Sequence, residues 1–164
     1  MPTSPADMQA PEFTLLDGSG RPVSLQDYRG KNVMLSFYPA DWSPVCSSEL
    51  SLFQECLDEI QSYNAEVLAI SVDGPFCHQA WAEHLRITFP LLSDFWPHGL
   101  VARAYGVFRP HEGIADRALF FIDPEGVIRH TWLAERPDLT PGLNVVLDSL
   151  ERLQSARRGD AFRV

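Results

Sequence analysis

The feature that most constrains the fold is a pair of apolar stretches on either side of one amphipathic helix. Residues 32–38 and 67–72 are rich in aliphatic, β-branched and aromatic side chains, as is typical of strands buried on both faces of a sheet. Between them, residues 44–63 repeat apolar side chains at spacings of three and four, which indicates a helix. A strand, a helix and a strand in this order form a right-handed crossover, so the two strands are parallel. Their carboxyl ends therefore meet at one edge of the sheet.

The other predicted elements extend this sheet at both ends of the chain. They comprise a short hairpin, a second helix, a short third helix, another hairpin and a closing helix. Their predicted ranges are 13–16 with 22–24, 75–86, 100–105, 118–122 with 127–133, and 140–156. On the second helix we expect Phe76, Ala80 and Trp81 on the apolar side. The order predicts an α/β, thioredoxin-like fold with a central mixed β-sheet flanked by helices and an N-terminal β-hairpin extension.

Length and charge limit the domain count and the partners. With 164 residues, the chain is expected to form a single domain over residues 11–158, with a flexible N-terminal arm over 1–10 and a C-terminal tail over 159–164. The net charge of −9 argues against binding to nucleic acid or to an anionic membrane. No apolar run reaches the ~18 residues of a membrane span, and the first ten residues lack the features of a signal peptide. We therefore expect a cytoplasmic protein.

Cysteine and histidine usage argues against a disulfide framework and against a metal site. The three cysteines are an odd number without a C-x-x-C pair, which suits a reducing compartment. The five histidines lack the spacing of metal ligands, so we expect surface or packing roles for them. The sequence thus predicts no metal and no organic cofactor.

Cys46 lies where a thiol becomes reactive. It follows the first buried strand and a loop with two prolines, in the first turn of a helix that Ser43 caps and Pro44 begins. The positive end of a helix and its unpaired N–H groups favour thiolate over thiol. Most free cysteines are small buried packing residues, but this position favours a nucleophile. The helix period places Cys46 on the inward face, together with Leu50, Phe53, Leu57 and Ile60.

These residues resemble the active-site motif of the peroxiredoxins. The match consists of Pro39-x-x-x-Ser43-x-x-Cys46, with Glu49 at the position of a glutamate that often follows. Three further stretches, residues 89–99, 104–108 and 113–117, are similar to the alkyl hydroperoxide reductase E group of bacterial peroxiredoxins. The resemblance runs from about residue 10 to about residue 132.

The resemblance implies a thiol-dependent peroxidase that reduces hydrogen peroxide and organic hydroperoxides. Cys46 would be the peroxidatic cysteine, which peroxide oxidises to a sulfenic acid. Arg117 would stabilise the thiolate and hold the peroxide oxygens, Ser43 would offer its hydroxyl, and Pro39 would shield the sulfur from water. Serine is less common than threonine at this position of the family, but it keeps the hydroxyl. Glu49 is expected to pair with and orient an arginine rather than to act as an acid catalyst.

The match over residues 113–117 favours Arg117 over Arg103 and Arg109 for this role. A thiol-disulfide oxidoreductase is less favoured, because no second cysteine lies one helical turn from Cys46. From another functional class, a redox sensor or relay that passes oxidation to a partner protein stays open. The resemblance also implies a homodimer and an external thiol reductant, either thioredoxin, a glutaredoxin-like protein or a low-molecular-weight thiol.

The fate of the sulfenic acid depends on the other two cysteines. Cys56 lies ten residues beyond Cys46 on the same predicted helix, ~15 Å away and beyond the ~7 Å limit for a disulfide, so it is a packing residue. Cys77 begins the helix after the second parallel strand, at the same sheet edge as Cys46. The relatives that the chain resembles work with one cysteine. We nevertheless favour Cys77 as a resolving cysteine, provided that the first turn of the Cys46 helix unwinds.

Overall fold

The computed structural model describes residues 7–161, with side chains described through residue 156. Its helices and strands alternate as the sequence predicts. In chain order they are β1 (Met8–Gln9), β2 (Thr14–Leu16), β3 (Pro22–Ser24), the 3-10 turn η1 (Leu25–Tyr28), β4 (Asn32–Phe37), α1 (Pro44–Glu55), α2 (Leu57–Gln61), β5 (Ala65–Ser71), α3 (Pro75–Leu85), β6 (Leu91–Ser93), α4 (Leu100–Ala104), β7 (Phe108–Arg109), β8 (Ile114–Ala115), β9 (Ala118–Ile122), β10 (Val127–Leu133) and α5 (Leu143–Ala161). Within the described range, no helix is long and apolar enough to cross a membrane.

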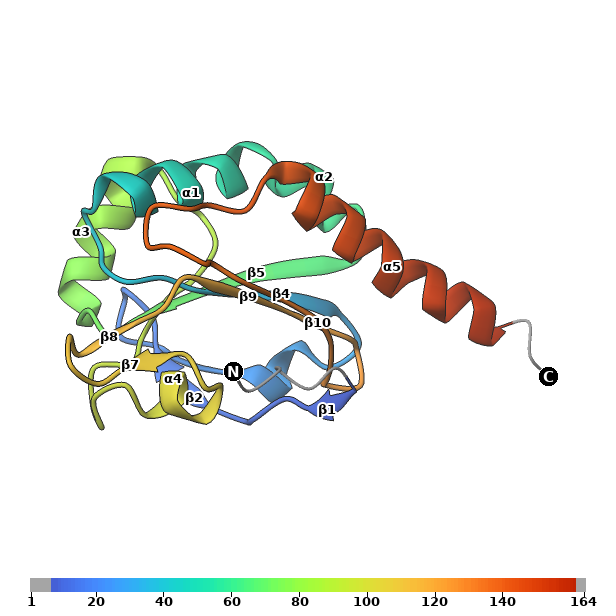
Figure 1. Ribbon diagram of the computed structural model, residues 1–164, viewed down its shortest axis with the longest axis horizontal. Coiled ribbons are helices and arrows are strands. Elements are labelled where there is room, and N and C mark those ends of the chain that lie inside the picture. Colours follow the sequence, from blue (N-terminus) through green and yellow to red (C-terminus); the bar gives the residue numbers. More distant parts are fainter. Residues whose placement is uncertain (1–6, 162–164) are drawn as a thin grey trace.

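A mixed sheet forms the centre of the molecule. Its strand order is β1-β10-β9-β4-β5-β6-β2-β3, and β7 pairs with β8 in a separate ribbon. Strands β4, β5 and β6 are parallel, whereas β9 runs antiparallel to β4. Figure 1 shows α1, α2 and α5 on one face of this sheet and α4 on the other. The predicted mixed sheet, its flanking helices and the N-terminal hairpin β2–β3 are confirmed.

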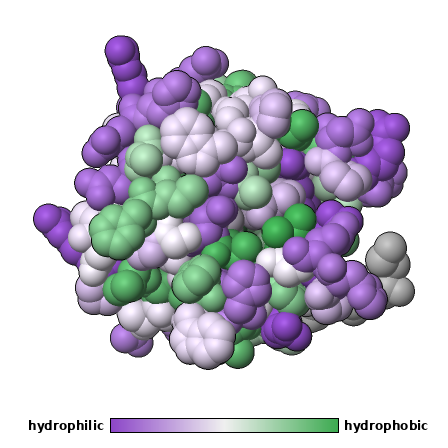
Figure 2. All heavy atoms as spheres, turned by 90° about the vertical axis from the view of Figure 1, so that its left-hand side faces the viewer, coloured by the Kyte–Doolittle hydropathy of each residue, from purple (hydrophilic) through white to green (hydrophobic). Residues whose placement is uncertain are grey.

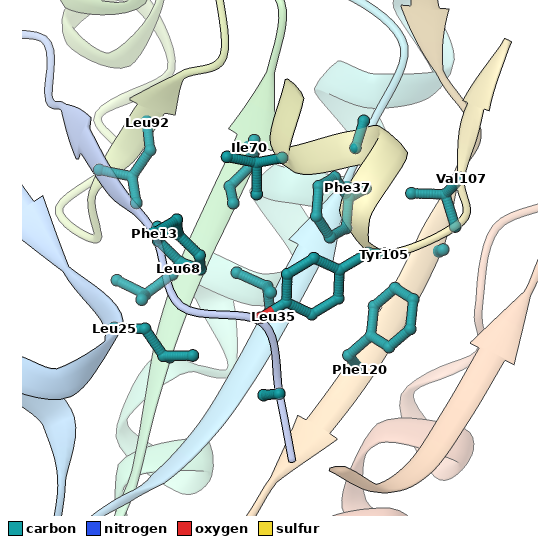
Figure 3. Packing of buried hydrophobic residues seen from close by; sticks show 14 of the residues in the cluster. Phe13, Leu25, Leu35, Phe37, Leu68, Ile70, Leu92, Tyr105, Val107 and Phe120 are labelled. Carbon is teal, nitrogen blue, oxygen red and sulfur yellow. The ribbon is translucent and has the colours of Figure 1, made fainter. Parts of the chain in front are cut away.

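Side chains from alternate positions of the central strands fill two separate cores, as the pleat of a strand requires. On β4, Leu35 and Phe37 face the core beneath α4, and Met34 faces the core beneath α1. Figure 3 shows the first core, where Tyr105, directly after α4, packs against Phe37 and Phe120. Burial on both faces explains why the central strands show little alternation of polar residues in the sequence.

Three helix predictions need correction. The helix predicted over 44–63 breaks at Cys56, whose backbone leaves the helical region and separates α1 from α2. On α3, Phe76 and Ala80 are exposed, because the buried side chains of this helix are His78 and Trp81; Phe76 is 89% exposed. The closing helix begins at Leu143 and not at residue 140. Thr140 itself is disfavoured in a helix because Pro141 follows it.

The predicted domain boundaries differ from the structure at both ends. Met8 and Gln9 pair with Ile128 and Val127 of β10, so this end of the predicted arm belongs to the sheet. Helix α5 continues to Ala161, into the predicted tail. Residues 1–6 and 162–164 lie outside the described part of the chain.

Candidate active site

The loop between β4 and α1 places Cys46 in the first turn of α1. Ser43 is the N-cap, and its Oγ accepts a hydrogen bond from the backbone N–H of Cys46 at 3.2 Å. Pro44 is the first helical residue, as predicted. Trp42 adopts a left-handed backbone conformation (φ 68°), which is uncommon for a residue other than glycine and tends to cluster at functional sites. The loop therefore turns sharply before the helix and directs Cys46 inward, where its side chain is 0% exposed.

Arg117 reaches the sulfur from the neighbouring strand. It precedes β9, whose Ala118 pairs with Phe37 at the end of β4. Nη1 and Nη2 of Arg117 each donate to the Cys46 sulfur at 3.4 Å, so the guanidinium binds the sulfur through two hydrogen bonds. The other two candidates are occupied elsewhere. Arg103 lies over the ring of Phe108, and Arg109 pairs with acidic side chains of its own ribbon.

Glu49 lies one helical turn beyond Cys46 and pairs with the same arginine. Its Oε1 accepts from Nη1 of Arg117 at 3.1 Å, and the two side chains are only 1% and 2% exposed. Burial raises the pKa of Glu49 to about 7, and the Arg117 charge only partly offsets this. Burial also opposes the charge of Arg117, but Glu49 and Cys46 outweigh it and raise the pKa of Arg117, which therefore stays a cation.

A small pocket leads to this buried group. It has a volume of about 150 Å³, and its lining includes Pro39, Arg117, Arg136 and Pro137. The carbonyl oxygen of Pro137 accepts from Nη2 of Arg117 at 3.3 Å, so the segment after β10 closes the site. Sequence reasoning missed this segment, because a backbone carbonyl contact leaves no signal in side-chain type. Pro39, which the resemblance implies as a shield for the sulfur, lines this pocket.

Cys77 lies in the first turn of α3 but faces a different group of residues from Cys46. Its sulfur and carboxylate oxygens of Asp41 and Asp73 lie within 4.8 Å of one another. Burial, followed by these two carboxylates, raises the pKa of Cys77 to about 11. The carboxylates already accept hydrogen bonds: Asp73 from Ser71 Oγ at 2.6 Å, and Asp41 from Tyr38 Oη at 2.6 Å. Cys56 is partly buried at the break between α1 and α2.

A buried polar network holds the active-site loop to α3. His78 Nδ1 lies 2.7 Å from Asp41 Oδ2, and His78 Nε2 lies 3.0 Å from the carbonyl oxygen of Leu92. Through these two contacts, His78 joins the active-site loop to β6. The sequence prediction gave His78 a surface or packing role and did not identify this pair. The available signal was the position of both residues just beyond neighbouring parallel strands.

Comparison with known protein families agrees with this geometry. The family model described as AhpC/TSA family matches residues 6–131. The chain belongs to the AhpC/TSA family. Among its AhpC/TSA relatives, alkyl hydroperoxide reductase E of Mycobacterium tuberculosis (strain ATCC 25618 / H37Rv) is 48% identical over 121 residues, covering 73% of this chain and 79% of the relative. Peroxiredoxin-1 of Gallus gallus is 37% identical over 139 residues, covering 78% of this chain and 69% of the relative.

Solved structures of peroxiredoxins confirm the predicted thioredoxin-like fold of this AhpC/TSA protein. The reduced 2-Cys peroxiredoxin of Plasmodium vivax superposes with a TM-score of 0.84 at 27% identity, covering 96% of this chain and 85% of that chain. AhpC of Enterococcus faecalis superposes with a TM-score of 0.80 at 33% identity, covering 96% and 95%. The predicted peroxiredoxin resemblance is therefore confirmed, and the chain is a peroxidase of the thiol-dependent class.

Proposed function

We propose that this peroxiredoxin reduces hydrogen peroxide and organic hydroperoxides at Cys46 and returns to its reduced form with an external thiol. The observation that carries the proposal is the pair of N–H groups of Arg117, each 3.4 Å from the buried Cys46 sulfur. A permanent cation with two donors on one sulfur favours the thiolate, which is the nucleophilic form. The pocket beside Arg117 has room for a small peroxide.

In the proposed reaction, the Cys46 thiolate attacks one peroxide oxygen. The sulfur–oxygen bond forms as the oxygen–oxygen bond breaks, the sulfur is oxidised by two electrons to a sulfenic acid, and water or an alcohol leaves after protonation. Arg117 would stabilise the charge that moves from sulfur to the departing oxygen. Ser43 Oγ accepts from the Cys46 N–H and keeps its own hydroxyl proton free to donate toward the peroxide. Pro39 lacks an N–H and keeps a competing donor out of the pocket wall.

Replacement of the nucleophile tests this assignment. Cys46→Ser should abolish peroxide consumption with excess dithiol, while Cys56→Ser, a matched change at the break between α1 and α2, should keep it. Continued peroxide turnover by the Cys46→Ser variant would refute the proposal. The wild type should complete many cycles; a single round of oxidation followed by slow reaction would instead indicate a redox sensor or relay.

We further propose that an external thiol, rather than Cys77, reduces the sulfenic acid. The reductant would be thioredoxin, a glutaredoxin-like protein or a low-molecular-weight thiol. Cys77 faces Asp41 and Asp73, and its pKa of about 11 leaves little thiolate at neutral pH to attack a sulfenic acid. This reverses the preference drawn from the sequence. Peptide mapping after one equivalent of peroxide should find Cys46 as sulfenic or sulfinic acid and Cys77 as a free thiol; a Cys46–Cys77 disulfide would restore Cys77 as the resolving cysteine.

A homodimer is part of the proposal. Figure 2 views the end of the molecule that carries the starts of α1 and α3, and apolar side chains gather there between hydrophilic ones. The exposed large apolar side chains include Trp42, Phe76, Phe95 and Trp96, of which Phe76 and Trp96 are 89% and 80% exposed. Exposed aromatic side chains are enriched in protein interfaces. Light scattering at micromolar concentration should give twice the chain mass, and Phe76→Asp should give a folded monomer; a monomeric wild type would contradict this.

A reducing cytoplasm would supply the thiol reductant and keep the three cysteines unpaired.

A further inference from the structure

Two acidic groups share one cation at the reacting sulfur. Nη1 of Arg117 donates to the Cys46 sulfur at 3.4 Å and to Oε1 of Glu49 at 3.1 Å. All three side chains are almost completely buried. A thiolate and a carboxylate beside a single guanidinium would leave an uncompensated negative charge away from water, which costs several kcal/mol. One of the two acids therefore holds a proton.

The hydrogen bonds of Glu49 agree with a proton shared between the two acids. Among the described residues, Glu49 Oε2 is buried without a hydrogen-bond partner, so the carboxyl has a single donor, Nη1 of Arg117 on Oε1. Burial raises the pKa of Glu49 to about 7 even beside Arg117. On the segment that closes the site, Arg136 pairs with Asp138 at 3.5 Å, and both side chains are mostly exposed. Arg117 and Cys46 are therefore the charged groups that decide the protonation of Glu49.

We propose that Cys46 and Glu49 share one proton across Arg117 and that the oxygen leaving the peroxide takes this proton. The inference rests on the proposed role of Cys46 as the nucleophile. It gives Glu49 a role beyond the orientation of Arg117, because the carboxyl stores a proton that the reaction consumes. Which of the two acids holds the proton before the reaction does not change the balance, since the pair titrates as a unit.

Atoms and charges balance over the whole cycle. Before the reaction the pair holds one proton; the sulfur then forms its bond to oxygen, the oxygen–oxygen bond breaks, and the departing alkoxide or hydroxide takes the stored proton. Cys46 is now a neutral sulfenic acid, and ionised Glu49 pairs with Arg117 alone. Two equivalents of an external thiol then return the sulfur to its reduced form, with release of water and an external disulfide. One of their protons stays with the pair.

Glutamine at position 49 separates storage of a proton from orientation of the arginine. Glu49→Gln keeps an oxygen that can accept from Arg117 but has no proton to give. The experiment adds one equivalent of hydrogen peroxide in weakly buffered solution, follows proton uptake with a pH indicator, and counts oxidised Cys46 in the same sample by mass spectrometry. Glu55→Gln is the matched control, because Glu55 is exposed on the same helix.

Just below neutral pH, the wild type and Glu55→Gln should take up no proton per oxidised Cys46, and Glu49→Gln should take up about one. In the wild type, uptake should rise toward one proton as the pH passes the pKa of Glu49, which burial raises to about 7. Glu49→Asp keeps a carboxyl and should restore the wild-type count. In the wild type, the rate of Cys46 oxidation should decline as the pH rises through neutrality. In Glu49→Gln this decline should be absent.

Equal proton uptake by the wild type and Glu49→Gln would overturn the proposal and leave Glu49 as an orienting residue. In that case Cys46 would still be oxidised, and its role as the nucleophile would stand. If peroxide is consumed without oxidation of Cys46, both the assignment of Cys46 and the shared proton are wrong.

Discussion

Replacement of Arg117 by alanine should slow the oxidation of Cys46 by two to three orders of magnitude. The variant loses two charge-assisted contacts to the sulfur, both at 3.4 Å. Hydrogen bonds to charged groups contribute ~1.5–3 kcal/mol each, and the lower end suits contacts of this length. The two together are worth ~3 kcal/mol, which corresponds to ~10²-fold in rate at ~1.4 kcal/mol per tenfold. Removal of a single preorganised donor from other active sites costs ~10²–10³-fold.

The assay is the rate of Cys46 oxidation under a small excess of peroxide, with rapid quenching and a count of the remaining thiol by mass spectrometry. The fold should survive, because Glu49 already has a pKa of about 7 and becomes neutral when it loses its partner. Circular dichroism and a urea titration check this point. Arg117→Lys should give an intermediate rate, since an ammonium keeps the charge but not the planar pair of donors.

Arg109→Ala is the matched control. Arg109 lines the same pocket, but its guanidinium is bonded to Glu112 at 2.6 Å and lies 3.5 Å from Asp116. We expect this variant to react within a few-fold of the wild type. A wild-type rate for Arg117→Ala, or an equally large loss for Arg109→Ala, would show that the contacts to the sulfur do not control its reactivity.

Three other predictions follow from buried titratable groups. His78→Ala should lower the free energy of unfolding by ~3–5 kcal/mol in a urea titration, because buried Asp41 would lose His78 and keep only the Tyr38 hydroxyl on its side chain; a loss below ~1 kcal/mol would contradict a stabilising His78–Asp41 contact. Because burial raises the pKa of Glu49 from 4.5 to about 7, the folded state binds more protons than the unfolded state between these values, and stability falls as the pH rises through this window. The wild type should therefore lose ~3 kcal/mol relative to Glu49→Gln over that range, and parallel curves would disprove it. Asp73→Asn should speed alkylation of Cys77 at neutral pH, since Asp73 contributes to its raised pKa of about 11; an unchanged rate would mean that burial alone protects this thiol.

The sequence predicts the sheet and the position of Cys46 because both depend on periodic patterns. Fully buried strands read as apolar runs, and Ser43 and Pro44 mark the start of α1 by capping rules that depend only on local residues. The antiparallel return of β9 next to β4 follows from strand order, and it places Arg117 at the sulfur. This part of the site is a consequence of topology.

The features that the sequence does not reveal depend on distances between separate elements. Nothing in the residue types shows that Pro137 closes the site through its carbonyl oxygen, or that His78 faces Asp41 in the interior. Phe76 shows that an apolar pattern alone does not identify the buried face of a helix. An aromatic residue near the start of α3 fits the pattern, but His78 and Trp81 are the side chains that α3 buries.

Burial explains both the reactivity of this site and the demands that it places on its residues. Burial excludes water from the sulfur. The attraction between Arg117 and the thiolate is therefore stronger, since the protein interior screens charges less than solvent does. The same closure makes Glu49 a weak acid, because its carboxylate loses hydration and shares one guanidinium with the sulfur. The proton needed by the departing oxygen is therefore held next to the thiolate by the same arginine that activates the thiolate.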